Sequence, residues 1–264
     1  MTVALLGAGK MGEALLAGLL AAGTPAADVR VVERNAARAA ELADTYGVTP
    51  TDLATAATAD VVVVVVKPQD VAGVLTELGP SLGRHTVVAS LAAGLSTAAL
   101  EASLPPGVPV VRVMANTPLL VREGMSVICA GTSAHEAHLD RVEALLATAG
   151  RVVRLPEYQF DAVTAVSGSG PAYLFLVAEA MIEGGVLLGL PRPVATELVA
   201  QTAVGAALML RDSGEHPAVL REAVTSPGGT TAAALRAFEA GGLRATVATA
   251  LQAASRRSAE LAGS

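Results

Sequence analysis

The chain has 264 residues, of which 52% are hydrophobic and 16% are charged, so it can bury a large core and is not disordered. Its formal net charge of −6 and its lack of a basic tract argue against a nucleic-acid partner. A single cysteine, Cys129, leaves no intramolecular disulfide, and the N-terminal sequence shows no signal peptide, so a cytoplasmic location is expected.

A glycine-rich turn follows the first predicted strand, residues 2–6, and precedes an apolar helical pattern. Its sequence, Gly7-Ala8-Gly9-Lys10-Met11-Gly12, has the spacing G-x-G-x-x-G, which is typical of dinucleotide binding when it joins a strand to a helix. Gly7 permits the tight turn, Gly9 lets a pyrophosphate approach the backbone, and Gly12 lets helix and strand pack closely. We therefore expect a dinucleotide whose phosphates lie at the helix N-terminus.

The end of the second predicted strand, residues 29–33, is where such proteins distinguish NAD from NADP. Glu33 is placed to hydrogen-bond the adenine ribose hydroxyls of NAD. Arg34 is placed to pair with the 2′-phosphate of NADP, and Arg38, one helical turn later, could add to that cradle. Alternatively, both charges cap the following helix on a solvated surface. The sequence therefore leaves the preference between NADPH and NADH open.

Further strands are predicted at 61–66, 86–90, 108–113, 126–130 and 151–155, with a helix at 134–149. Lys67 and Asn116 follow two of these strands, at the edge where doubly wound sheets bind ligands. The Asn116 amide either pairs with the nicotinamide carboxamide or holds its own loop in shape. His135 and His138 lack further metal ligands nearby, so no metal site is expected. Together these elements predict a Rossmann-type domain over residues 1–160.

The stretch Asp161–Tyr173, DAVTAVSGSGPAY, separates the β runs from a second half that is predicted to be helical throughout. Ser167 to Gly170 is typical of a flexible break, either an interdomain hinge or the floor of a cleft between cofactor and substrate. The second predicted domain covers 161–264. Its helices are expected at 171–189, 193–212, 217–224, 230–240 and 243–261.

Apolar residues surround much of the circumference of these helices, for example at 194–210. Glutamates and glycines interrupt the segment 171–190, so we expect a buried helix there and not a membrane span. A five-helix domain cannot cover so many apolar faces by itself. The surplus predicts a homo-oligomer built through the helical half.

Between two of the predicted helices lies the loop Thr225–Thr231, TSPGGTT. Two glycines and several hydroxyl residues immediately before a helix are typical of an anion nest, in which the N–H groups of Gly229 to Thr231 hold a carboxylate. The alternative is a plain helix N-cap with a flexible lead-in.

With these motifs the chain resembles the pyrroline-5-carboxylate reductase family. DAVTAVSGSGPAY resembles the family signature and TSPGGTT its substrate loop, and GAGKMG, VKP at 66–68, SLAAG at 90–94 and RVMANTP at 112–118 match as well. The resemblance implies an α/β fold with an N-terminal Rossmann-type domain and an all-α C-terminal dimerisation domain. It also implies an enzyme that reduces L-1-pyrroline-5-carboxylate to L-proline, the last step of proline biosynthesis, with NADP(H) or alternatively NAD(H).

The resemblance implies site residues and partners as well. Thr231 is the family position whose hydroxyl faces the imine nitrogen, so it is the expected catalytic residue. The family forms a helix-swapped dimer that commonly assembles into decamers, and neither a membrane nor a nucleic acid is an expected partner. The expected cofactor-binding residues are Leu6, Gly7, Ala8, Gly9, Lys10, Met11, Gly12, Glu33, Arg34, Lys67, Pro68, Leu91, Ala92, Ala93 and Asn116. The expected substrate-binding residues are Ser226, Gly228, Gly229, Thr230, Thr231 and Glu157, although the spacing of Glu157 gives no reason for its role.

Two positions depart from the family pattern. Ala115 stands where the family has proline, so the loop that carries Asn116 is expected to be less rigid, and Glu33 weakens the expectation of NADP. A β-hydroxyacid dehydrogenase is disfavoured because no lysine follows Lys67. An imine reductase for another cyclic imine and a catalytically silent dinucleotide-binding protein stay open. The oligomer number, feedback by proline and the choice between Ser167 and Ser169 as a ligand contact do not follow from the sequence.

Overall fold

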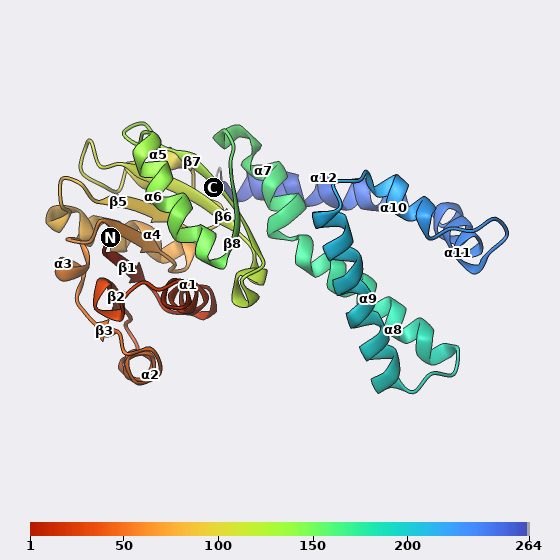
Figure 1. Cartoon of the computed structure of the whole chain (residues 1–264). Coiled ribbons are helices and arrows are strands. Elements are labelled where there is room, and N and C mark those ends of the chain that lie inside the picture. The colour runs from red at the N-terminus through yellow and green to blue at the C-terminus, as the bar shows by residue number, and fades with distance from the viewer. Residues whose placement is uncertain (263–264) are drawn as a thin grey trace. The chain divides into compact units, whose positions relative to one another are not determined.

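The computed structural model describes residues 1–262 and divides into two compact units, whose elements are labelled in Figure 1. The sheet unit comprises Met1–Ser169 together with the chain from Ala254 onward. The helical unit comprises Gly170–Ala253. The chain therefore leaves the sheet unit once and returns to it near the C-terminus.

The sheet unit is built on one eight-stranded sheet with the order β3-β2-β1-β4-β5-β6-β7-β8. Every neighbouring pair is parallel except β6 and β7, which are antiparallel. The two-residue strand β3 has no sequence signal and was not predicted, whereas the other seven lie within the predicted runs or two residues of them. The strands are β1 Val3–Leu6, β2 Val29–Val32, β3 Thr49–Pro50, β4 Val61–Val64, β5 Val87–Ser90, β6 Val110–Ala115, β7 Gly124–Ala130 and β8 Gly150–Arg154.

Helices cover both faces of this sheet, which is the doubly wound arrangement expected from the sequence. Val61 and Val63 of β4 point to the face that α1 and α6 cover, and Val62 and Val64 point to the face that α4 covers (Figure 1). An uninterrupted valine run is stable in this place because both of its faces are buried. The helices of the unit are α1 Lys10–Ala21, α2 Ala36–Tyr46, α3 Leu53–Ala56, α4 Pro68–Leu78, α5 Thr97–Glu101, α6 Glu136–Leu146 and α7 Phe160–Val163.

The flexible break predicted at Ser167 to Gly170 is wrong. The chain is helical from α7 through a π-helical turn at Thr164–Gly168 into α8, Gly170–Leu187. The Ser169 N–H donates to the Thr164 carbonyl at 2.8 Å, which is the i→i+5 bond of a π turn. The Ser167 hydroxyl donates to the Val163 carbonyl at 3.1 Å. Serine and glycine here shape a helical turn, and the boundary between the two compact units falls directly after it, between Ser169 and Gly170.

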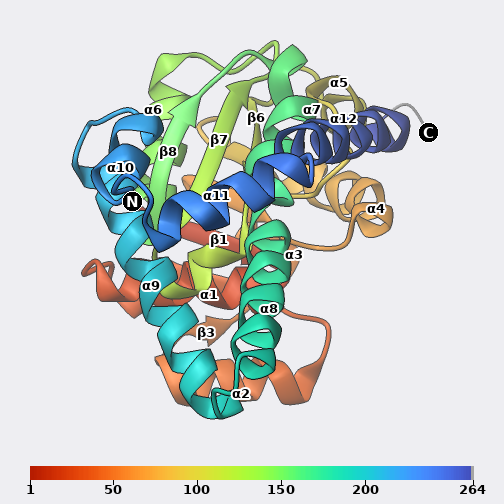
Figure 2. The same cartoon turned by 90° about the vertical axis from the view of Figure 1, so that its right-hand side faces the viewer.

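The helical unit consists of helices that match all five sequence predictions to within two residues at each end. Helices α8 and α9 lie side by side in both views (Figures 1 and 2). Prolines begin α9 and α10, as their fixed φ permits at the first turn of a helix. The helices after α8 are α9 Arg192–Asp212, α10 Pro217–Ala223, α11 Thr230–Ala240 and α12 Leu243–Ala262.

The helical unit has almost no core of its own. Within Gly170–Ala253, all of which the structure describes, Ala195 is the one buried residue. The prediction of a buried helix at 171–190 is therefore wrong for the single chain, because Leu174, Phe175 and Leu176 are 71%, 68% and 66% exposed. Apolar composition indicates that a face will be covered, but it does not indicate by what.

Among residues 1–262, two helical segments are long and apolar enough to cross a membrane, judged by length and composition alone. They are Glu157–Leu187 and Arg192–Asp212, with mean hydropathies of 1.3 and 1.4. The same property is found in helices that associate with other protein helices, so it does not by itself identify a membrane segment.

The end of α12 belongs to the sheet unit and is anchored there. The Ser258 hydroxyl donates to Asp161 Oδ1 at 2.7 Å, and Ser258 is buried. Gly94 adopts a left-handed conformation with φ of 77°, and a Cβ at this position would lie 3.4 Å from Leu261 Cβ. The small residue after β5 therefore lets the last helical turn approach the sheet closely.

Candidate active site

A pocket of about 460 Å³ lies in the sheet unit at the carboxyl ends of β1, β2 and β4. The strand order reverses at β1, between β2 and β4, and such a switch point is where doubly wound sheets bind their ligands. The pocket is lined by Leu6, Gly7, Gly9, Val32, Glu33, Arg34, Leu53, Val65, Val66, Lys67, Asp70, Val74 and Glu77.

The glycine-rich turn has the geometry that its spacing predicts. Gly7 has φ of 92°, and a Cβ there would lie 3.1 Å from the Val65 carbonyl oxygen. A Cβ on Gly12 would lie 2.3 Å from the Gly7 oxygen, so both positions require glycine. A Cβ on Gly9 would meet no heavy atom within 4 Å, so the space above Gly9 is open. This is the space that a pyrophosphate needs for its approach to the backbone.

Helix α1 begins without a side-chain cap. Its N-cap residue is Gly9, which has no side chain to accept the first amide hydrogens. The first N–H groups of a helix lack intrahelical partners, and they carry the positive end of the helix dipole. The turn therefore fits the phosphates of a dinucleotide, which would satisfy these donors.

The Glu33 carboxylate is fixed at the rim of the same turn. Its Oε2 accepts a hydrogen bond from the Ala8 N–H at 3.1 Å, and its Oε1 accepts one from the Asn35 N–H at 2.9 Å. The Ala8 amide is thus engaged by a carboxylate in this structure. A fixed negative charge beside the pocket favours a ribose hydroxyl as a neighbour and disfavours a phosphate.

The two arginines near the end of β2 differ in their engagement. Arg38 pairs with Glu41 and Glu13, and the hydrogen bonds that its guanidinium donates to these two carboxylates raise its pKa. Arg34 lines the pocket, and no hydrogen-bond or ion-pair partner is found for it among residues 1–262. Arg34 is therefore the guanidinium that is available for a 2′-phosphate, and Arg38 is already neutralised.

Several lining residues carry no sequence signal. Leu53 comes from α3, and Asp70, Val74 and Glu77 lie on α4. Asp70 lies in the first turn of α4, three residues after the predicted cofactor residue Lys67. This closeness to Lys67 is the sequence feature that could have predicted Asp70 as a lining residue of the pocket. The pocket thus contains three carboxylates against Arg34 and Lys67.

Some predicted cofactor residues do not line this pocket. Leu91, Ala92 and Ala93 follow β5 at the same edge of the sheet, where the Leu91 N–H donates to the Val64 carbonyl at 2.9 Å. The others outside the lining are Ala8, Lys10, Met11, Gly12, Pro68 and Asn116. Their contact with a cofactor stays a prediction.

The Asn116 amide is used within the protein. Its Oδ1 accepts a hydrogen bond from the Met125 N–H at 2.8 Å, and its Nδ2 donates to the Ser167 carbonyl at 3.1 Å. Asn116 is buried. This geometry supports the interpretation that Asn116 holds the loop after β6, and these two bonds fix the loop even though Ala115 replaces the family's proline.

Glu157 is engaged in an ion pair inside the sheet unit. Its carboxylate accepts hydrogen bonds from the Thr97 N–H at 2.7 Å and from the Thr97 hydroxyl at 2.6 Å, and it pairs with Arg112 at 2.9 Å. Arg112 is buried with its guanidinium 4.6 Å from the centroid of the Phe160 ring. Burial works against ionisation of Glu157, but the bonds from Thr97 and Arg112 outweigh it and lower its pKa. In this placement Glu157 ties α5 and β6 to the chain before α7, and its contact with the substrate stays a prediction.

The predicted substrate loop lies in the helical unit and ends in a second uncapped helix. Helix α11 begins at Thr230 with Gly229 as its N-cap and no side-chain cap. Gly228 has φ of 72°, and the Gly229 N–H donates to the Ser226 carbonyl at 3.0 Å, which forms a tight turn before the helix. No side chain caps the helix, and both the anion nest and the plain N-cap remain compatible with this geometry. Thr230 and Thr231 present their amide groups at a helix N-terminus that is able to hold a carboxylate.

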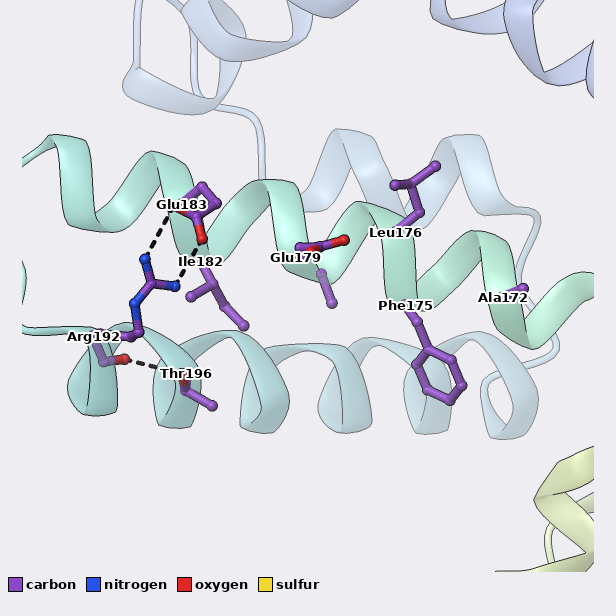
Figure 3. A pocket seen from close by; sticks show the side chains of 9 residues that line it. Ala172, Phe175, Leu176, Glu179, Ile182, Glu183, Arg192 and Thr196 are labelled. Atoms are coloured by element: carbon purple, nitrogen blue, oxygen red, sulfur yellow. Dashed lines mark hydrogen bonds and ion pairs between the residues drawn. The ribbon is translucent and has the colours of Figure 1, made fainter.

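An apolar groove lies between α8 and α9 in the helical unit, with a volume of about 680 Å³ (Figure 3). Phe175, Leu176 and Ile182 project from α8, and Arg192 and Thr196 lie on α9 (Figure 3). The Arg192–Glu183 ion pair, at 2.7 Å, closes one end. Glu179 also lines the groove, and the remaining lining residues of α8 are apolar, as expected of a surface that another protein helix covers.

Comparison with known proteins decides between the functions that stayed open. Residues 157–261 match the family described as pyrroline-5-carboxylate reductase dimerisation, and residues 2–94 match NADP oxidoreductase, coenzyme F420-dependent. The chain is 48% identical over 265 residues to a pyrroline-5-carboxylate reductase of Corynebacterium melassecola, and the match covers 98% of each.

The chain belongs to the pyrroline-5-carboxylate reductase family.

Solved structures of this family have the same fold as the chain. A pyrroline-5-carboxylate reductase from Coxiella burnetii is 36% identical and superposes with a TM-score of 0.94 over 98% of both chains. The Plasmodium falciparum pyrroline carboxylate reductase, solved with NADP bound, is 29% identical with a TM-score of 0.87, and the match covers 99% of this chain and 98% of that one. Membership confirms the α/β fold class, with a Rossmann-type sheet domain followed by a helical dimerisation domain.

Proposed function

We propose that this pyrroline-5-carboxylate reductase family member reduces L-1-pyrroline-5-carboxylate to L-proline with NAD(P)H, holding the cofactor on the sheet unit and the substrate carboxylate on the helical unit. As a family member it is an oxidoreductase that uses NAD(P)H on a C=N bond. The observation that supports the proposal is the pair of uncapped helix N-termini, α1 after Gly9 and α11 after Gly229. Each fits one of the two anionic groups that the reaction brings together.

The cofactor, when bound, supplies a hydride to the imine carbon. The protein's part is to hold the phosphates on the N–H groups that follow Gly9 and to orient the adenosine end beside Glu33 and Arg34. Leu91 to Ala93 would border the cofactor further along the same edge, after β5.

The substrate carboxylate would lie on the amides of Gly229, Thr230 and Thr231, with the Ser226 hydroxyl and the Gly228 turn at its side. Because backbone N–H groups supply the positive potential, no lysine or arginine is needed in this loop. The Thr231 hydroxyl would face the imine nitrogen. A threonine hydroxyl is a weak acid, so its role is to orient the nitrogen or to relay a proton from water.

We propose residues 1–160 as the cofactor domain and 161–264 as the substrate and dimerisation domain. We propose that a second copy of the chain covers the apolar faces of α8 and α9 in a homodimer. This dimer is proposed to assemble further, up to a decamer. The match to a dimerisation family over both membrane-length helices favours a protein partner over a lipid one. A cytoplasmic location is part of this proposal.

Substrate choice and the role of Thr231 can be tested together. Wild-type protein should oxidise NADPH or NADH with L-1-pyrroline-5-carboxylate far faster than with 1-pyrroline, which has the same ring without the carboxylate. Thr231→Ala should lower kcat by roughly ten- to a thousandfold, the effect of losing one positioned polar group. Thr225→Ala is the matched control, because the Thr225 hydroxyl is bound to the Arg221 carbonyl. Equal rates with both imines would favour the broader imine reductase, and no oxidation with either would favour the silent binder.

A further inference from the structure

A second polar pocket lies in the sheet unit at the edge opposite the cofactor pocket. It is lined by Arg84, His85, Gly107, Pro109, Ser133, His135, His138 and Arg141, and its volume is about 370 Å³. Arg84 and His85 precede β5, Gly107 and Pro109 precede β6, and the rest follow β7 or lie on α6. Because β7 is antiparallel to β6, its carboxyl end meets the amino end of β6, where Ala130 pairs with Val111. The pocket is thus separate from the glycine-rich turn.

The charges of α6 are divided between two sides of the helix. Glu136, Asp140 and Glu143 all pair with Arg154 of β8, at 2.6, 2.5 and 2.5 Å. The hydrogen bonds that Arg154 donates to Asp140 and to Glu143 raise the pKa of Arg154. The acidic residues of α6 therefore all pair with Arg154 on β8, on the side of the helix away from the pocket.

The other side of α6 is basic and faces the pocket. His135, His138 and Arg141 recur every three residues, a spacing that places side chains on one helical face. The loop before β5 adds Arg84 and His85. No carboxylate lines the pocket, although the chain has a net charge of −6 and three of its four histidines are gathered here. The charge of Arg141 acts on Asp60, which lies outside the lining and accepts a hydrogen bond from the Thr2 N–H at 2.7 Å.

The internal hydrogen bonds of the pocket leave donors for a ligand. His138 Nδ1 accepts a hydrogen bond from the His135 N–H at 3.2 Å, so the neutral His138 ring carries its proton on Nε2. Arg141 Nη1 donates one hydrogen bond to the His85 carbonyl at 3.1 Å. For Arg84 no partner is found within residues 1–262.

The basic groups are held close enough to oppose one another's charge. The His135 and His138 rings lie 3.9 Å apart. Burial and then the charges of His135 and Arg141 lower the pKa of His138. A multiply charged oxyanion would reverse this effect, since it favours the protonated form of every imidazole that faces it.

We propose that the Arg84–His85–His135–His138–Arg141 pocket binds the phosphate group of a small molecule, with the two guanidiniums as fixed cationic donors and the imidazoles as pH-dependent ones. Planar guanidinium groups match the geometry of phosphate oxygens, and the N-terminus of the eleven-residue helix α6 adds a favourable dipole. This inference does not depend on the proposed reaction.

The histidines allow the site to be tested in the intact protein. The Cε1–H resonances of the four histidines are followed by NMR during titration with inorganic pyrophosphate, with His216 of the helical unit as the internal reference. The resonances of His85, His135 and His138 should shift and saturate together below about 10 mM, while His216 stays unchanged. Titration with a nucleoside diphosphate in parallel shows whether the phosphate group alone suffices or a nucleoside adds affinity; both support the site.

A matched pair of arginine variants distinguishes binding in this pocket from nonspecific electrostatic attraction of pyrophosphate to surface arginines. Arg141→Gln should weaken pyrophosphate binding by about tenfold or more, the effect of losing one charged hydrogen bond, whereas Arg151→Gln on the exposed face of β8 should not change it. Binding should be tighter at about pH 6 than at about pH 8, because the bound anion opposes the effects that lower the pKa of His138 and favours its protonated form. Unshifted pocket histidines, an equal shift of His216, or equal effects of the two variants would overturn the proposal.

Discussion

Glu33 and Arg34 place opposite charges on adjacent residues at the rim of the cofactor pocket. The glycine-rich turn itself holds Glu33, through the Ala8 N–H, so this carboxylate stays near the adenine ribose whichever cofactor binds. Arg34 is exposed, and it is the arginine that is available for a 2′-phosphate, because Arg38 is paired with Glu13 and Glu41. Glu33 and Arg34 therefore act in opposite directions on the choice between NADPH and NADH.

Two variants at these positions should move cofactor preference in opposite directions. Glu33→Ser should lower the KM for NADPH by about tenfold relative to that for NADH. The substitution removes the repulsion between the Glu33 carboxylate and the 2′-phosphate, whose energy is roughly that of one charged hydrogen bond. Arg34→Ala should raise the KM for NADPH by a similar factor and leave that for NADH nearly unchanged. Steady-state kinetics with both cofactors measures this, and parallel effects on NADPH and NADH in either variant would contradict the assignment.

Glu157 should matter for stability more than for substrate affinity. Glu157→Gln leaves Arg112 buried without its counter-charge, which should cost about 2–3 kcal/mol of unfolding free energy. Folding lowers the pKa of Glu157, so its contribution is present above the unfolded value of about 4.3 and is lost as pH falls further. Urea unfolding at pH 7 and pH 3 should show a difference between wild type and variant that shrinks at the lower pH. A difference in unfolding free energy that is the same at both pH values would argue against the ion pair. A raised KM for the substrate with unchanged stability would instead support the predicted substrate contact of Glu157.

At the scale of single elements, two glycines of the glycine-rich turn have different roles: Gly12 is needed for packing, and Gly9 is needed for the approach of the ligand. Gly12→Ala should lower both Tm and cofactor affinity, because its Cβ would overlap the Gly7 carbonyl oxygen. Gly9→Ala should leave Tm within about 2 °C of wild type yet weaken cofactor binding by at least about tenfold, since the protein leaves its Cβ position empty and the pyrophosphate would fill it. Calorimetric melting and cofactor titration on both variants provide the comparison. Gly9→Ala with wild-type affinity would mean that the phosphates do not lie over this residue.

The elements that the sequence predicts well are those whose signal is local. The valines of β4, the glycine turn and the proline-started helices α9 and α10 each carry their pattern within a few residues. The π turn at Thr164–Gly168 was missed because SGSG is typical of a break, and what keeps it helical includes Asn116, 51 residues away from Ser167. The structural role of Glu157 was missed for the same reason, since Thr97 and Arg112 lie 60 and 45 residues away.

For the whole molecule, the helical unit lacks a core in the single chain, so its stability should depend on association. Leu176→Glu places a charge in the exposed groove between α8 and α9, and burying that charge in an interface is costly. The subunit dissociation constant should rise by at least about tenfold, since an interface leucine contributes more than 1.4 kcal/mol. Val153→Glu, an exposed valine on β8 in the sheet unit, is the control. Light scattering over a dilution series would refute the assignment if both variants kept the wild-type mass.

The central claim is hydride transfer to the C=N carbon of L-1-pyrroline-5-carboxylate. Its most direct test is mass spectrometry of the product formed with NADPH or NADH that carries deuterium at the transferable C4 position. The account predicts L-proline with one deuterium at C5, formed by wild type and strongly reduced in Thr231→Ala. Cofactor oxidation without labelled proline, or no oxidation with either cofactor, would contradict it.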